Sequence, residues 1–187
     1  MSVIKPGLEQ FAPVAIGAAL IVMVYSCGHV SGAHFNPAVT LAVWIRGKCE
    51  TKDVPGYMGA QVAAAIVAGF VAPFLKGNQA IEAGTHAVFP ALVAEFLITF
   101  ALAWVVLNVA TAKGTSGNSF YGLAIGFTVL SGAYAVGGVS GGVFNPAVAV
   151  GITVMGLASA ADIWIYLVAN LAGGAAAALA FKALADD

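Results

Sequence analysis

The stretch Ser31-Gly32-Ala33-His34-Phe35-Asn36-Pro37-Ala38-Val39-Thr40 decides the fold, because the chain contains a near-copy of it further on. The second copy reads Gly141-Gly142-Val143-Phe144-Asn145-Pro146-Ala147-Val148, a shift of 109 residues from Asn36 to Asn145. The same ungapped shift aligns Ala15-Ile16-Gly17 with Ala124-Ile125-Gly126 and Tyr57 with Tyr166. Many transport proteins use an internal repeat with matching interruptions in apolar segments to build a site at the bilayer midplane.

The composition predicts an integral membrane protein. Of 187 residues, 61% are hydrophobic and 8% are charged, whereas soluble domains have about 25% charged residues. The formal net charge of −1 argues against nucleic acid as a partner. Cys27 and Cys49 are too few and too differently placed to form a disulfide framework, so we expect two free thiols.

Five apolar segments are long enough to cross a bilayer core, which requires roughly 20 residues. They lie at about 11–29, 54–75, 88–112, 119–138 and 163–182. Two shorter apolar stretches, 37–45 and 146–155, each follow Asn and begin with Pro, the preferred order for a helix cap and first helical position. Each therefore predicts a half-helix. The preceding stretches, 28–35 and 137–144, are rich in Gly and Ser, and we expect them to be non-helical and to line a pore.

The placement of basic residues predicts the orientation, because Lys and Arg in short loops favour the cytoplasmic side. Tracing the spans places five of the seven basic residues on one side: Arg46, Lys48, Lys52, Lys113 and Lys182. Lys5 and Lys76 fall on the other side. The N-terminus is then expected outside and the C-terminus in the cytoplasm.

Residues 31–40 closely resemble the signature of the aquaporin, or major intrinsic protein, family, and residues 141–147 resemble its partner motif. The likeness extends over almost the whole chain from Ala15. It implies an all-α membrane protein, an aquaporin-like right-handed bundle of five transmembrane helices and two re-entrant half-helices arranged as an inverted repeat. The family is usually homotetrameric, with one pore per subunit. We therefore expect one channel domain over 1–187 in a plasma or inner membrane, with repeat 1 over about 1–76, a loop over about 77–87 and repeat 2 over about 88–187.

The resemblance also implies pore residues, namely the two Asn-Pro-Ala motifs Asn36, Pro37, Ala38 and Asn145, Pro146, Ala147. Half-helices that meet at their N-termini each present about half a positive charge, which repels cations and protons. The two Asn amides can donate hydrogen bonds to a passing water oxygen. An Asn that served only as a helix cap would explain the helix start but not the matching polar loop before it.

The expected selectivity filter departs from the family pattern. Most members have Arg directly after the second motif, where this chain has Val148, and the other filter positions, carried over by spacing, are Ile16, Ala133 and Gly142. All four are small or apolar. We therefore expect a wide, dry constriction that passes water and other small neutral solutes, with ammonia, hydrogen peroxide and small polyols as candidates.

Two further residues are expected to brace the pore loops. By the resemblance, Glu95 accepts backbone N–H bonds from the loop near Ser140. His34 occupies a family position that supports the first loop. A gate or metal pair is the alternative reading of His29 and His34, but no Cys or carboxylate cluster accompanies them. We expect no metal and no cofactor.

The counterpart of the 88–112 span in the first repeat would lie before residue 1, so the chain lacks the usual first helix of the family. A misassigned start, a truncated chain and a five-span variant all fit this observation. A non-conducting membrane scaffold or assembly subunit is the alternative to a channel. The sequence contains no nucleophile paired with a base and no phosphate-binding loop, so we expect no enzymatic activity.

Overall fold

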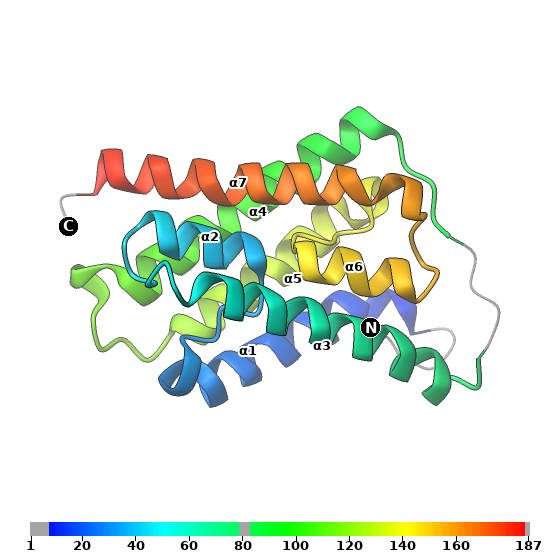
Figure 1. Ribbon diagram of the computed structural model, residues 1–187, viewed down its shortest axis with the longest axis horizontal. Helices are drawn as coiled ribbons and strands as arrows, with labels where there is room; N and C mark the ends of the chain where they lie inside the picture. Colours follow the sequence, from blue (N-terminus) through cyan, green and yellow to red (C-terminus); the bar gives the residue numbers. More distant parts are fainter. Residues whose placement is uncertain (1–7, 79–82, 186–187) are drawn as a thin grey trace.

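The computed structural model describes residues 8–78 and 83–185, and every α-helix that it contains is shown in Figure 1. The α-helices are α1 (Ala12–Ser31), α2 (Pro37–Ile45), α3 (Val54–Leu75), α4 (Val88–Thr111), α5 (Tyr121–Ser140), α6 (Pro146–Val154) and α7 (Ile163–Leu184). Five of them are long and apolar enough to cross a membrane, and α2 and α6 have nine residues each. The predicted fold class, five spans and two half-helices, is therefore confirmed.

The half-helices start where the Asn-Pro pairs predict. Asn36 has an extended backbone (φ −154°, ψ 121°), and its side-chain oxygen accepts a hydrogen bond from the N–H of Ala38 at 2.8 Å. Asn145 caps α6 in the same way, with its oxygen 2.9 Å from the nitrogen of Ala147. Pro occupies the first helical position of both, where no backbone N–H is needed. Helix α6 ends at Val154, one residue before the predicted end.

The prediction that 28–35 and 137–144 are non-helical was wrong for the first four residues of each stretch. Helix α1 continues to Ser31 and α5 continues to Ser140. Each ends at a left-handed glycine, Gly32 with φ 70° and Gly141 with φ 89°. A helix commonly ends at such a glycine because it has no Cβ to clash in the left-handed conformation. The glycines inside these stretches remain helical, so the true pore loops are 32–36 and 141–145.

The two repeats pack into each other. The half-helix α2 of the first repeat lies against α7 of the second, and α6 lies against α3. Glycine allows both contacts, since an ideal Cβ on Gly174 would lie 2.5 Å from the carbonyl oxygen of Ala38. A Cβ on Gly151 would lie 3.0 Å from the oxygen of Ala65. Helices α1 and α5 cross at Gly17 and Gly126 with similarly close backbones.

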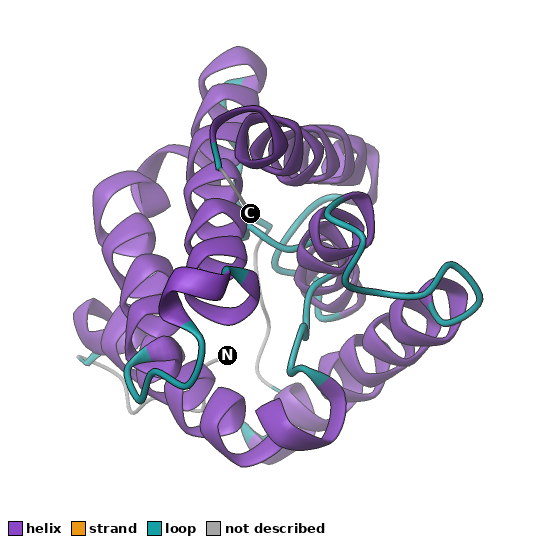
Figure 2. Cartoon of the chain, turned by 90° about the vertical axis from the view of Figure 1, so that its left-hand side faces the viewer, coloured by secondary structure: helices purple, strands orange, loops and turns teal. Residues whose placement is uncertain are grey.

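The end of the bundle at which α2, α4 and α7 finish carries most of the charge, and we call it the basic end. It includes Lys48 and Lys113, which lie after α2 and α4, and Lys182 near the end of α7 (Figure 1). Figure 2 views the bundle from this end and shows the teal loops lying among the purple helices. Lys76 follows α3 at the opposite end. Lys5, assigned above to the outer side, lies outside the described residues.

The long helices of the two repeats are covered unequally. Helix α4 packs against α7 and α5, and nine residues of α7 are buried. No described helix takes the equivalent place against α3 and α1, and Gly69 is the only buried residue of α3. Apolar side chains such as Phe70 and Phe74 are exposed there instead.

Candidate pore

The tips of the two half-helices are joined by reciprocal hydrogen bonds. The side-chain nitrogen of Asn36 donates to the carbonyl oxygen of Phe144 at 2.8 Å. The side-chain nitrogen of Asn145 donates to the carbonyl oxygen of Phe35 at 2.9 Å. A carboxamide nitrogen carries two hydrogens, so each Asn keeps one that these cross-links do not use. Both amides can therefore offer a donor to a solute at the point where the tips meet.

Positive backbone dihedrals set the direction of these carbonyls. Phe35 has φ 49° and Phe144 has φ 50°, a left-handed conformation that is unusual for a bulky residue. Such strain persists where the surrounding structure fixes it, and it concentrates at functional sites. Here the cap made by the following Asn holds it, together with the Asn amide of the other repeat that donates to the Phe carbonyl oxygen. These two carbonyls were not predicted from the sequence as tip-joining groups, although the identity of Phe35 and Phe144 across the repeat was a signal.

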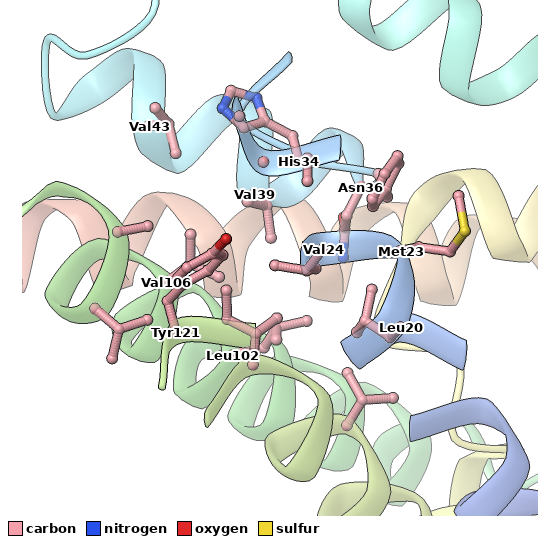
Figure 3. Close-up of a pocket in the computed structure, with 18 of the residues that line it drawn as sticks. Leu20, Met23, Val24, His34, Asn36, Val39, Val43, Leu102, Val106 and Tyr121 are labelled. Carbon is pink, nitrogen blue, oxygen red and sulfur yellow. The ribbon is translucent and has the colours of Figure 1, made fainter. Parts of the chain in front are cut away.

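One cavity of about 1340 Å³ passes both Asn side chains and is partly shown in Figure 3. It reaches Lys48 and Lys113 at the basic end, and Ile16, Gly141 and Gly142 also line it. A water molecule takes up about 30 Å³ in the liquid, so the cavity has room for many waters. Its lining includes no Asp or Glu side chain among the described residues. The space is thus polar at the Asn pair, and the described part of the chain brings no carboxylate to it that would attract cations.

Three of the four expected filter residues, Ile16, Gly142 and Val148, line this cavity. The fourth, Ala133, is not among the lining residues, and its Cα lies 3.5 Å from the position of a Cβ on Gly142. Ala133 therefore lies next to Gly142. The structure brings small and apolar groups together here and provides no guanidinium at residue 148.

Glu95 joins α4 to the second pore loop and is completely buried. One carboxylate oxygen accepts from the Ser140 hydroxyl at 2.7 Å and from the N–H of Val143 at 2.8 Å. The other accepts from the N–H of Phe144 at 2.6 Å. Hydrogen bonds to an ionised acceptor are among the stronger ones in proteins. The family resemblance implied the same arrangement, in which Glu95 accepts hydrogen bonds from backbone N–H groups of this loop.

His34 lies beside the first pore loop with a different set of contacts. Its Nδ1 is 3.2 Å from the hydroxyl of Thr40, and its ring stacks on Tyr57 with 4.7 Å between centroids. The Tyr57 hydroxyl donates to the carbonyl oxygen of Ser31 at 2.8 Å, and Gln61 donates to Thr40 at 2.9 Å. His29 also lines the cavity. Within residues 8–78 and 83–185, no three His, Cys, Asp or Glu side chains gather as a metal site.

Opposed half-helices whose Asn side chains meet beside a long cavity, inside a bundle of apolar helices, define a membrane channel of the aquaporin type. The chain belongs to the major intrinsic protein family, whose family model matches residues 3–184. Members of the aquaporin family are channels and not enzymes.

Individual relatives agree with this assignment. Aquaporin NIP1-4 of Oryza sativa subsp. japonica is 39% identical over 186 residues, which cover 95% of this chain and 67% of the relative. Aquaporin NIP1-1 of Zea mays is 38% identical over 190 residues, which cover 95% of this chain and 64% of the relative. The chain thus spans about two thirds of the length of these relatives. The crystal structure of the aquaglyceroporin from Plasmodium falciparum has the same fold, with a TM-score of 0.77 at 19% identity, covering 98% of this chain and 85% of that chain.

Proposed function

We propose that the chain forms a passive channel for water and small neutral solutes, with its basic end in the cytoplasm. The observation that carries the proposal is the pair of Asn amides, each with one unused hydrogen, beside a single cavity. A solute oxygen that accepts from both amides has little capacity left to relay a proton. The clustering of Lys and Arg in the short loops of one end supports the orientation.

Exclusion of cations follows from the same tips. The N-termini of α2 and α6 face each other across the cross-links, and each carries about half a positive charge. Because Val148 supplies no fixed positive charge, these two helix ends form the main barrier to cations.

The apolar filter extends the solute class beyond water. Ile16, Gly142 and Val148 offer a solute few donors and leave more space than a guanidinium and an aromatic ring would leave. Ammonia, hydrogen peroxide and small polyols are therefore candidates besides water. The fold shared with an aquaglyceroporin is consistent with glycerol as one polyol to test.

Proteoliposomes that contain the purified chain test the proposal. Vesicle shrinkage is measured by light scattering, first under an impermeant osmolyte and then under glycerol. We expect faster shrinkage than in empty vesicles, followed by re-swelling as glycerol enters. Strict water selectivity would refute the wide-filter proposal, and no increase over empty vesicles would favour a non-conducting scaffold.

Val148→Arg sharpens the filter test, with Val148→Leu as the matched control that adds bulk without charge. The arginine variant should lower the ratio of glycerol to water permeability about ten-fold, since a charged donor in a narrow site discriminates by roughly 1.4 kcal/mol or more. The leucine variant should change that ratio less. Equal ratios in both variants would show that charge at residue 148 does not set selectivity.

A further inference from the structure

The wall of the cavity between the Asn pair and the basic end is mostly aliphatic. Six of its residues have branched hydrocarbon side chains: Val24, Val39, Val43, Leu102, Val106 and Ile125. The first residue of α5, Tyr121, lines the same part of the cavity (Figure 3). In Figure 3 its ring lies beside Val106 and Leu102. A phenol therefore stands beside branched aliphatic side chains, in a cavity whose lining also includes the polar side chains of His29, His34, Thr115 and Asn118.

The ring of Tyr121 is held from one side by α1. An ideal Cβ on Gly28 would lie 3.4 Å from a ring carbon of Tyr121 and 3.6 Å from its hydroxyl oxygen. The ring of Tyr25 packs edge-on, with 5.1 Å between the centroids. Tyr25 is itself fixed, because its hydroxyl donates to the carbonyl oxygen of Ser119 at 3.0 Å. The position of the Tyr121 ring is thus determined by packing.

The hydroxyl of Tyr121 differs from every other tyrosine hydroxyl of the chain. The chain has five tyrosines, and the other four each donate to a backbone carbonyl oxygen: Tyr25, Tyr57, Tyr134 and Tyr166. The Tyr121 hydroxyl makes no hydrogen bond to any described residue, although the side chain is half-buried. A phenol in such a place ordinarily finds a partner. A solute in the cavity is the partner that the surroundings leave open.

The other end of the pore shows that the fold does not require this aromatic ring. A shift of 109 residues places Ala12 opposite Tyr121 in the repeat, and Gly137 opposite Gly28. An ideal Cβ on Gly137 would have no heavy atom within 4 Å, so the equivalent position on α5 is open. The tyrosine is therefore a feature of one mouth of the pore.

We propose that Tyr121 is a specificity-determining residue at the basic end of the cavity, selecting small neutral solutes that hydrogen-bond. This inference rests on the proposed channel function. The hydroxyl supplies a donor and an acceptor where branched aliphatic side chains alone would favour loss of water from the passage. The ring, seated on Gly28, limits the width available to larger solutes. A solute thus meets the hydroxyl of Tyr121 in addition to the amides of the Asn pair.

Two substitutions separate the hydroxyl from the ring. Tyr121→Phe removes only the hydroxyl and should lower water permeability about five-fold, the effect of roughly one hydrogen bond. Tyr121→Ala removes the ring and should raise the permeability to polyols larger than glycerol relative to water. Tyr134→Phe is the matched control, since Tyr134 also lies on α5 but does not line the cavity and donates to Gln10.

The measurements are proteoliposome shrinkage with water, glycerol and sorbitol, together with the thermal unfolding temperature of each variant. Tyr121→Phe should unfold at the wild-type temperature because the Tyr121 hydroxyl makes no hydrogen bond within residues 8–78 and 83–185. A permeability equal to that of wild type, or a loss of stability greater than in Tyr134→Phe, would overturn the role of Tyr121. A wild-type protein that conducts no water would instead overturn the channel function on which the inference rests.

Discussion

The two repeats reach the same tip geometry with different support. In the second repeat, the carboxylate of Glu95 accepts from Ser140, Val143 and Phe144 and ties their loop to α4. The corresponding donors of the first repeat are the Ser31 hydroxyl and the N–H groups of His34 and Phe35. Within the described residues, neither N–H has a hydrogen-bond acceptor. The first loop is held instead from α3, through the stack of His34 on Tyr57.

This difference shows which contacts define the tip. Both half-helices have the same extended Asn, the same cap and the same reciprocal cross-link, although among the described residues a carboxylate lies beneath the second loop alone. Cap and cross-link therefore fix the tip, whereas Glu95 adds stability to one side. The substitutions that follow test this division of roles.

The largest effect is expected for Glu95→Ala. Three buried donors lose their acceptor, at about 1–3 kcal/mol each, so the free energy of unfolding should fall by at least about 3 kcal/mol. Thermal unfolding in detergent, followed by circular dichroism, measures the change. A matched pair compares the repeats: Ser140→Ala should destabilise more than Ser31→Ala, because only Ser140 contacts the carboxylate. Equal losses in the pair would contradict unequal bracing.

Gly174→Ala should have the next largest effect. Its Cβ would lie 2.5 Å from the Ala38 carbonyl oxygen and would push α7 away from α2, at a cost of about 1–3 kcal/mol. Gly59→Ala in α3 is the control, because a Cβ there meets no heavy atom within 4 Å and alanine favours a helix by up to about 1 kcal/mol. Thermal unfolding should therefore move in opposite directions in the two variants.

Asn36→Ala and Asn145→Ala should each cost about 2 kcal/mol, from a cap of about 1 kcal/mol and a cross-link of similar size. Because the two side chains belong to one network, the double variant should lose less than the sum of the single variants. A double-mutant cycle on the free energy of unfolding measures the coupling. Strict additivity would mean that the tips are held independently.

The smallest effect is expected at Cys49, in the turn between α2 and α3. Burial raises the pKa of this thiol, and the nearby negative charges of Asp53 and Glu50 raise it further. A raised pKa leaves less thiolate at pH 7, so alkylation by iodoacetamide should be slower than for a free thiol and should accelerate as the pH rises. Asp53→Asn should speed the reaction about two-fold, since an exposed charge is worth less than about 1 kcal/mol. Asp162→Asn, at the equivalent place in the other repeat, should leave the rate unchanged.

Much of the fold was predictable because its signals are local. Apolar length predicted the spans, and Asn followed by Pro predicted where α2 and α6 begin. The ends of α1 and α5 were misplaced because glycine was interpreted as a helix breaker along the whole stretch. In the structure only Gly32 and Gly141, which adopt positive φ, end these helices.

The pore was less predictable because it depends on contacts between distant residues. Spacing placed Ala133 in the filter, whereas the residues that line the cavity include its neighbour Gly142 and not Ala133 itself. The cross-links to Phe35 and Phe144 join residues more than a hundred positions apart, and no local pattern encodes them. Tyr121 was not predicted as a pore residue because its counterpart in the first repeat is Ala12. A comparison of the two repeats identifies the positions that match, and Tyr121 is not one of them.

The reciprocal bonds between the tips constrain how a duplicated chain can change. Each half relies on a main-chain oxygen of the other, so neither loop can shift its backbone without displacing an amide in its partner. Side chains elsewhere in the two copies are free to drift apart, as His34 and Val143, and Tyr121 and Ala12, have done. Sequence divergence between the halves should therefore be lowest at the centre of the membrane and increase toward both surfaces.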